Sequence, residues 1–246
     1  MNRPISIAIE TSSRRGGAAL GAGEELLAEA DFDASARHGV QLVGRLAELV
    51  ASASLRPSDL EEVYVSVGPG SFTGTRIGVT VARTLAHAVG GIRCVAVPGP
   101  DAVAEAARQL DWRHLGVILD ARGGLIHATR FDRPGPGEGR AGDDAVRTGP
   151  GRVIAPADFL AQTPRPLMLL GEGLGYHDLR ADGVTIPRPD ATDAPPHVPT
   201  AASVWRVGRR LAAAGRFTEP AELLPIYSRT PRAQRVWDEK HDLSGH

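Results

Sequence analysis

The chain has 246 residues, of which 42% are hydrophobic and 23% are charged, a composition typical of a folded globular protein. Its formal net charge of −1 excludes nucleic-acid binding through an overall basic field. Cys94 is the sole cysteine, so no internal disulfide forms, and we expect a reducing, cytoplasmic location. Lys240 is the sole lysine, which excludes Schiff-base chemistry and a phosphate-loop lysine in the body of the chain.

In chain order, the spacing of apolar residues predicts strands mixed with helices. Strands are expected at residues 5–10, 18–20, 26–28, 63–67, 92–97, 115–120, 125–131 and 167–170. Helices are expected at residues 39–53, 72–89, 101–110, 156–162 and 200–214, and Asp101 is the expected N-cap of the third helix. This order is typical of an α/β protein with mixed sheets and helices on their faces. Residues 1–4 lead directly into a strand and no apolar run is long enough for a bilayer, so we expect neither a signal peptide nor a membrane span.

The chain divides into two predicted lobes, residues 1–110 and residues 111–246. Residues 133–151 are rich in Gly, Pro, Arg and Asp and are expected to form a long exposed loop. From residue 219 onward we expect a polar, irregular tail.

Each predicted lobe opens with an apolar strand that ends in an acid, Glu10 or Asp120, followed by a turn with two glycines and a further strand. Two carboxylates in this arrangement could face one another across a cleft between the lobes and hold metal and phosphate through water. They could equally be unrelated acids at two hairpin turns, and the pattern leaves both interpretations open.

The Gly-rich segment at residues 68–78 is the most distinctive part of the sequence. It does not match a phosphate loop, because Arg76 stands where that motif needs lysine followed by Ser or Thr. It does not match a nucleophile elbow either, because Pro69 stands where the first glycine of G-x-S-x-G belongs. None of the histidines has the H-x-x-x-H or H-E-x-x-H spacing of a zinc site.

Two stripes run along the predicted helix 72–89. Small residues recur every four positions, with an apolar stripe beside them: Gly74, Gly78, Ala82 and Ala86, then Ile77, Val81 and Leu85. Glycine inside a helix costs about 1 kcal/mol relative to alanine, so two of them indicate a packing demand. The small stripe allows close approach of another helix, either within the fold or across an interface with a partner. The spacing alone favours packing within the fold and leaves the interface open.

Four segments together resemble the TsaB/YeaZ family: residues 7–13, 68–78, 119–122 and 224–229. The resemblance implies two actin-like (ASKHA) lobes, each a mixed sheet with flanking helices. It implies a subunit without catalytic residues, cofactor or metal, which binds a TsaD-type transferase and acts with a TsaE-type ATPase. That transferase modifies adenosine 37 of tRNAs reading ANN codons, so tRNA is contacted indirectly through the complex. A homodimer is expected when the partner is absent.

The resemblance also implies roles for individual residues. The partner face lies on the predicted helices 39–53 and 72–89 and comprises Leu42, Leu46, Leu49, Gly70, Ser71, Phe72, Thr73, Gly74, Arg76, Ile77, Gly78, Val81, Ala82 and Leu85. The remnants of a nucleotide site are Glu10, Thr11, Ser12 and Asp120. Glu10 departs from the family's usual Asp, and Gly123 stands where a basic residue is common. The alternative function is an actin-like ATP-binding phosphotransferase or hydrolase that uses Glu10 and Asp120.

Overall fold

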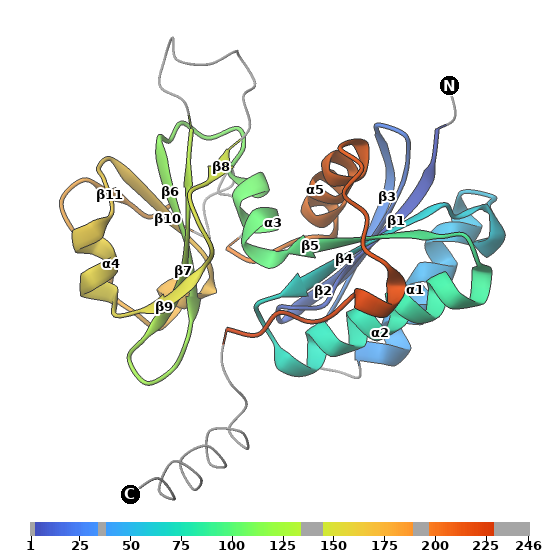
Figure 1. Cartoon of the computed structure of the whole chain (residues 1–246), viewed down its shortest axis with the longest axis horizontal. Helices are drawn as coiled ribbons and strands as arrows, with labels where there is room; N and C mark the ends of the chain where they lie inside the picture. The colour runs from blue at the N-terminus through green and yellow to red at the C-terminus, as the bar shows by residue number, and fades with distance from the viewer. Residues whose placement is uncertain (1–2, 34–37, 134–144, 189–196, 229–246) are drawn as a thin grey trace, which may run out of the picture.

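The computed structural model describes residues 3–33, 38–133, 145–188 and 197–228. Two lobes lie side by side, each built on one sheet, with the helix α3 (Gly99–Ala106) between them (Figure 1). None of the described helices has the length and apolar character needed to cross a membrane.

The first sheet has five strands in the order β3-β2-β1-β4-β5. They are β1 (Ile5–Glu10), β2 (Arg15–Ala22), β3 (Glu25–Asp33), β4 (Glu62–Gly68) and β5 (Arg93–Pro98). The first three form an antiparallel meander, and β4 and β5 continue the sheet parallel to β1. Residues of β1 alternate between two buried faces: Ile7 and Ile9 join one core cluster and Ala8 joins another.

Helices cover both faces of the first sheet (Figure 1). The pair α1 (His38–Ser52) and α2 (Phe72–Val89) contributes to the core on the Ile7 side. The helix α5 (Ala201–Ala213) packs on the opposite face, where Trp205 and Val204 meet Ala8 and Tyr64. The predicted boundary after residue 110 therefore does not assign every element to the sheet on which it packs. The helix α5 lies beyond that boundary in sequence but packs on the first sheet.

The second sheet has the order β11-β10-β6-β7-β8, and β9 also pairs with β7. Its strands are β6 (His114–Asp120), β7 (Ile126–Asp132), β8 (Val146–Arg147), β9 (Arg152–Ile154), β10 (Leu167–Leu170) and β11 (Val184–Thr185). The helix α4 (Pro156–Gln162) packs on one face through Phe159, and α3 packs on the other through Val103 and Ala104. Both lobes thus open with an antiparallel hairpin, β1–β2 or β6–β7, as the sequence repeat predicts.

Three local predictions need correction. The N-cap of α3 is Pro98, and Asp101 lies in the first turn instead, because the chain enters the helix directly from β5. The stretch 133–151 contains β8, while residues 134–144 lie outside the described part of the chain. The start of the tail is ordered, not irregular. Residues Pro220–Glu222 form a 3-10 helix, η3, and the Ile226 N–H donates a 2.7 Å hydrogen bond to the Val67 carbonyl.

Candidate functional site

The small-residue stripe of α2 packs against the end of β1 in its own lobe. A Cβ atom added at Gly74 would lie 1.9 Å from the carbonyl oxygen of Thr11, and one added at Gly78 would lie 2.3 Å from Thr11 Oγ1. Thr11 Oγ1 also donates a 2.8 Å hydrogen bond to the Gly74 carbonyl, and Ala82 is fully buried. The stripe therefore does not form the outward surface predicted for it. Its glycines allow α2 and its own sheet to come into backbone contact.

The adjacent side of α2 and the neighbouring α1 border an apolar groove of about 480 Å³. Val43, on α1, is 56% exposed at the groove, and Val81 and Leu85 of α2 are half-buried in it. None of the described residues that line the groove is charged. A hollow of this kind suits an apolar ridge from another protein, because exposed apolar patches of this type commonly mark interaction sites.

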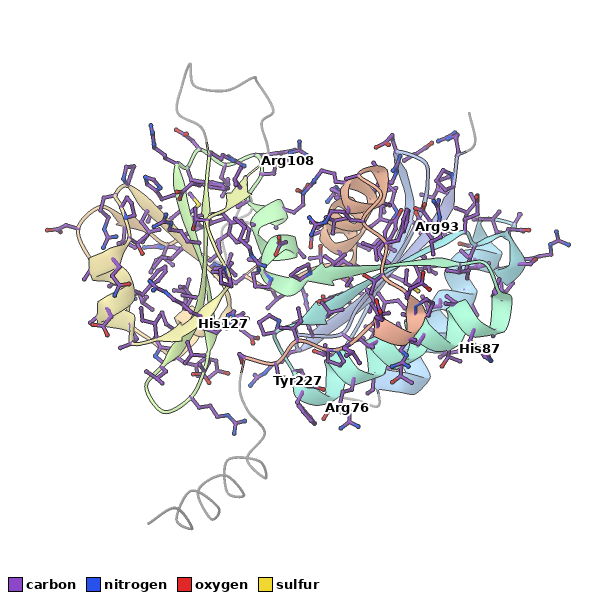
Figure 2. The ribbon with its side chains drawn as sticks, viewed as in Figure 1. Arg76, His87, Arg93, Arg108, His127 and Tyr227 are labelled. Carbon is purple, nitrogen blue, oxygen red and sulfur yellow. The ribbon has the colours of Figure 1, made fainter. Side chains whose placement is uncertain are left out.

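An aromatic cluster lies at the N-terminal end of α2. Ser71 caps the helix by accepting a 3.2 Å hydrogen bond from the Gly74 N–H. Phe72 is 48% exposed, and its ring centroid lies 4.8 Å from that of Tyr227. The Arg76 guanidinium lies over the same Phe72 ring, 5.3 Å from its centroid, so Arg76 and Tyr227 appear beside each other at this end of α2 (Figure 2). The cluster adds aromatic and cationic surface at the N-terminal end of α2.

The residues predicted for the partner face divide into two groups. The first group is buried against the core of its own lobe: Leu42, Leu46, Leu49, Gly74, Gly78 and Ala82. Exposed or half-buried positions are Gly70, Ser71, Phe72, Thr73, Arg76, Ile77, Val81 and Leu85. Only the second group presents substantial surface to another molecule, so the accessible face is narrower than the sequence predicts, and its contact with a partner stays a prediction.

Sequence reasoning left several residues of the groove outside the predicted face. They include the exposed residues Val43, Ala47, Ala51, Thr84 and Ala88. The sequence of α1 contains an indication of these residues. Val43 and Ala47 each follow a buried leucine, so the apolar face of α1 is wider than packing against the core alone requires.

Glu10 ends β1 with its side chain fully buried. Its Oε1 accepts hydrogen bonds from the Ser12 N–H at 2.5 Å and from Ser12 Oγ at 2.7 Å. Its Oε2 has no hydrogen-bond partner among the described residues. Burial raises the pKa of Glu10 to about 7, although hydrogen bonds from Ser12 and Ser66 oppose the increase. The Ser12 carbonyl accepts a hydrogen bond from the Ser71 N–H, so the turn that holds Glu10 is tied to the start of α2.

Asp120 ends β6 in a different polar environment. Its Oδ1 accepts a 2.9 Å hydrogen bond from the Arg122 N–H and lies 3.0 Å from His177 Nε2. Burial raises the pKa of nearby Glu172; the Arg14 charge opposes this effect and the Asp120 charge adds to it. The hydrogen bonds of Glu10 and Asp120 thus run to different groups, and the described residues hold no cluster of three or more His, Cys, Asp or Glu placed for a metal ion.

Together, the fold and the site define a class of protein. Two lobes with mixed sheets, each opened by an antiparallel hairpin and continued by a parallel strand, form an α/β protein, and this arrangement is consistent with an actin-like (ASKHA-like) fold. Two structures from Pseudomonas aeruginosa share this fold. An uncharacterised protein with similarity to peptidase YEAZ aligns with a TM-score of 0.75 at 21% identity, covering 92% of this chain and all of the other. YeaZ itself aligns with a TM-score of 0.72, also at 21% identity, covering 91% of this chain and 99% of its own.

Sequence comparison agrees with the fold. The model of the family described as TsaD, tRNA N6-adenosine threonylcarbamoyltransferase, matches residues 32–148. The tRNA threonylcarbamoyladenosine biosynthesis protein TsaB of Bacillus subtilis (strain 168) is 28% identical over 235 residues, which cover 95% of this chain and 97% of that protein. An uncharacterised protein of Mycobacterium tuberculosis (strain H37Rv) is 26% identical over 80% of this chain and 77% of its own length. These matches support a TsaB/YeaZ assignment, since the chain is similar to proteins of that name over most of its length.

Proposed function

We propose that this chain is a non-catalytic subunit of the complex that forms N6-threonylcarbamoyladenosine at position 37 of tRNAs reading ANN codons. The observation that carries the proposal is the similarity to the Bacillus subtilis threonylcarbamoyladenosine biosynthesis protein over 95% of the chain. The match of residues 32–148 to the transferase family supports it, because a chain descended from the same ancestor as the transferase is suited to pair with it in a pseudo-symmetric dimer.

The proposed partners are a TsaD-type transferase, which this chain binds and activates, and a TsaE-type ATPase. The groove between α1 and α2 supports this assignment, since it is apolar and lined by the exposed Val43. The aromatic cluster around Phe72 adds a second exposed surface on α2. In the absence of the transferase, the same face would pair with a second copy of the chain about a two-fold axis.

Depletion of the chain in its native cell tests the proposed function. We expect the N6-threonylcarbamoyladenosine content of hydrolysed tRNA, measured by mass spectrometry of nucleosides, to fall and to recover when the wild-type chain is restored. Reconstitution then separates a subunit from an enzyme, since the chain alone should transfer nothing while its addition to the transferase and the ATPase should restore modification. Unchanged tRNA modification after complete depletion would refute the proposal.

The alternative function, ATP-dependent phosphotransfer or hydrolysis, remains worth testing because of Glu10. Its buried carboxyl with a pKa raised to about 7 is the kind of group that gathers at active sites. Calorimetric titration of the chain with ATP and magnesium, followed by a turnover assay, distinguishes the two functions. Turnover that disappears in Glu10→Ala would favour the enzyme, and turnover that persists would point to a contaminant.

A further inference from the structure

A second hollow lies in the other lobe, away from α1 and α2, between β7, the segment that leads into β9, and α4. It encloses about 360 Å³ and is lined by Arg130 of β7, Arg152 of β9 and Gln162 of α4. No carboxylate occurs among the described residues that line it. Two strands and a helix thus direct hydrogen-bond donors to one small space, and positive charge dominates its lining.

The two arginines are held in different ways. Arg152 is at the surface, and its Nη2 donates a 2.5 Å hydrogen bond to Gln162 Oε1. Because this contact uses the amide oxygen, it orients the amide N–H groups of Gln162 as further donors. Arg130 is half-buried, and its Nη2 lies 3.4 Å from Asp132 Oδ2, so a carboxylate from outside the hollow neutralises part of its charge.

The Nε–H of Arg130 is buried and has no hydrogen-bond acceptor among the described residues. An N–H group that gives up water without gaining a partner costs about 1–3 kcal/mol, and more when the group is charged. An acceptor placed in the hollow would remove that cost. The described lining therefore offers cationic donors and no carboxylate acceptor, which is the reverse of what a metal ion would need.

We propose that this hollow is a binding site for a phosphate group, with Arg130 at its inner end and Arg152 and Gln162 at its rim. A single guanidinium already satisfies a planar carboxylate through two parallel hydrogen bonds. Two guanidinium groups carried by different strands suit a tetrahedral, doubly charged anion better, because its oxygens point in several directions. The phosphate could belong to a small phosphorylated compound or to an RNA backbone. The site is independent of the proposed function.

Calorimetric titration of the full chain with sodium phosphate, at constant ionic strength, tests the site itself. We compare wild type with Arg152→Gln, which removes one charge from an exposed rim position, and with Arg180→Gln as the matched control. Arg180 lies in the same lobe, its side chain is 86% exposed, and it does not line the hollow. We expect phosphate affinity to fall at least about tenfold in Arg152→Gln, as for loss of a charged hydrogen bond, and to stay unchanged in Arg180→Gln. Circular dichroism confirms that both variants fold.

A second titration with fluorescently labelled tRNA identifies the source of the phosphate. If RNA is the ligand, Arg152→Gln weakens tRNA binding and reduces its salt dependence by about one phosphate contact between about 50 and 200 mM salt, whereas Arg180→Gln does neither. If the binding of inorganic phosphate depends on Arg152 and the binding of tRNA does not, the site takes a small phosphorylated compound.

Three outcomes would overturn the proposal: wild type that binds neither phosphate nor tRNA, Arg152→Gln that binds both as wild type does, or acetate that binds as tightly as phosphate. None of them would alter the proposed function, which depends on the modification of tRNA in cells and on binding to the transferase.

Discussion

At the scale of single residues, two helical glycines have opposite environments. A Cβ atom at Gly74 would lie 1.9 Å from the Thr11 carbonyl oxygen, whereas one at Gly44 on α1 would meet nothing within 4 Å. We expect Gly74→Ala to destabilise the fold by about 1–3 kcal/mol through overpacking and Gly44→Ala to stabilise it by up to about 1 kcal/mol through helix propensity. Denaturant unfolding measures both changes. A Gly74→Ala variant as stable as wild type would show that α2 does not approach β1 so closely.

Glu10 makes stability depend on pH with a defined sign. Its pKa of about 7 in the folded chain exceeds the ordinary value of 4.5, so the folded state binds the proton more tightly than the unfolded state does. The stability contributed by neutral Glu10 is therefore complete below about pH 4.5 and is lost as the pH rises through 7. A difference of this size corresponds to about 3 kcal/mol.

Glu10→Gln isolates that effect, because glutamine is neutral at every pH and keeps a similar shape. We expect the free energy of unfolding of wild type, relative to Glu10→Gln, to decrease between about pH 5 and about pH 8. Urea titrations at a series of pH values measure the difference. Parallel pH profiles for the two proteins would mean that Glu10 titrates near its ordinary pKa.

At the scale of elements, the sequence locates α2 well but does not orient it. The period of its apolar residues predicts a helix over residues 72–89, and α2 spans Phe72–Val89. Its small stripe and its apolar stripe lie side by side, however, and either could face the sheet. The choice depends on how closely the end of β1 approaches, and this long-range contact between Thr11 and Gly74 leaves no mark in the local pattern.

The short strands of the second lobe show the same limit. β9 and β11 contain only three and two residues, too few for alternation to be recognised. Neighbouring strands define them instead: β9 pairs with β7, and β11 pairs with β10. For the candidate site, the sequence predicts that α1 and α2 carry the partner face, which stays a prediction. The exposure of Val43 and the burial of Leu42 could not be predicted in this way, because they follow from how α1 rests on the sheet.

The groove between α1 and α2 provides a test at this scale. We expect Val43→Asp to weaken binding to the TsaD-type transferase by at least about tenfold, because a carboxylate there would be desolvated in an apolar interface without a partner. The matched control is Val146→Asp on β8, since Val146 is 62% exposed and does not line the groove. Co-purification and calorimetry measure the binding. Equal loss in both variants, or in neither, would exclude the groove as the contact surface.

At the scale of the whole molecule, a helix near the end of the described chain packs against strands from its beginning. α5 follows the second sheet in sequence but covers the first sheet. The helix α3 also connects the two lobes through ion pairs. Asp101 Oδ2 lies 3.0 Å from Arg147 Nη2 of the second lobe, and Glu105 Oε2 lies 2.7 Å from Arg210 Nη1 of α5. Removal of the packing at α5 should therefore destabilise β1 and β2, although these strands are far from α5 in sequence.

Trp205 of α5 is a large buried side chain in the packing of α5 on the first sheet. Its side chain is 4% exposed, its Nε1–H donates a 2.9 Å hydrogen bond to Ser6 Oγ on β1, and a Cβ atom at Gly21 of β2 would lie 2.3 Å from its ring. We expect Trp205→Ala to cost about 3–5 kcal/mol, as for a large buried aromatic side chain. Arg206→Ala is the control, because Arg206 is the next residue of the same helix and is exposed.

Hydrogen exchange followed by mass spectrometry shows where the loss falls. If α5 seals the first lobe, Trp205→Ala lowers protection of amides in β1 and β2 more than in β6 and β10, because local opening removes only the contacts that α5 makes. Equal loss in both sheets would mean instead that the lobes unfold as one cooperative unit and that α3 transmits the damage. Unchanged protection in β1 and β2 would contradict the packing of α5 on the first sheet, since a buried tryptophan cannot be removed from a closed layer without weakening the strands beneath it.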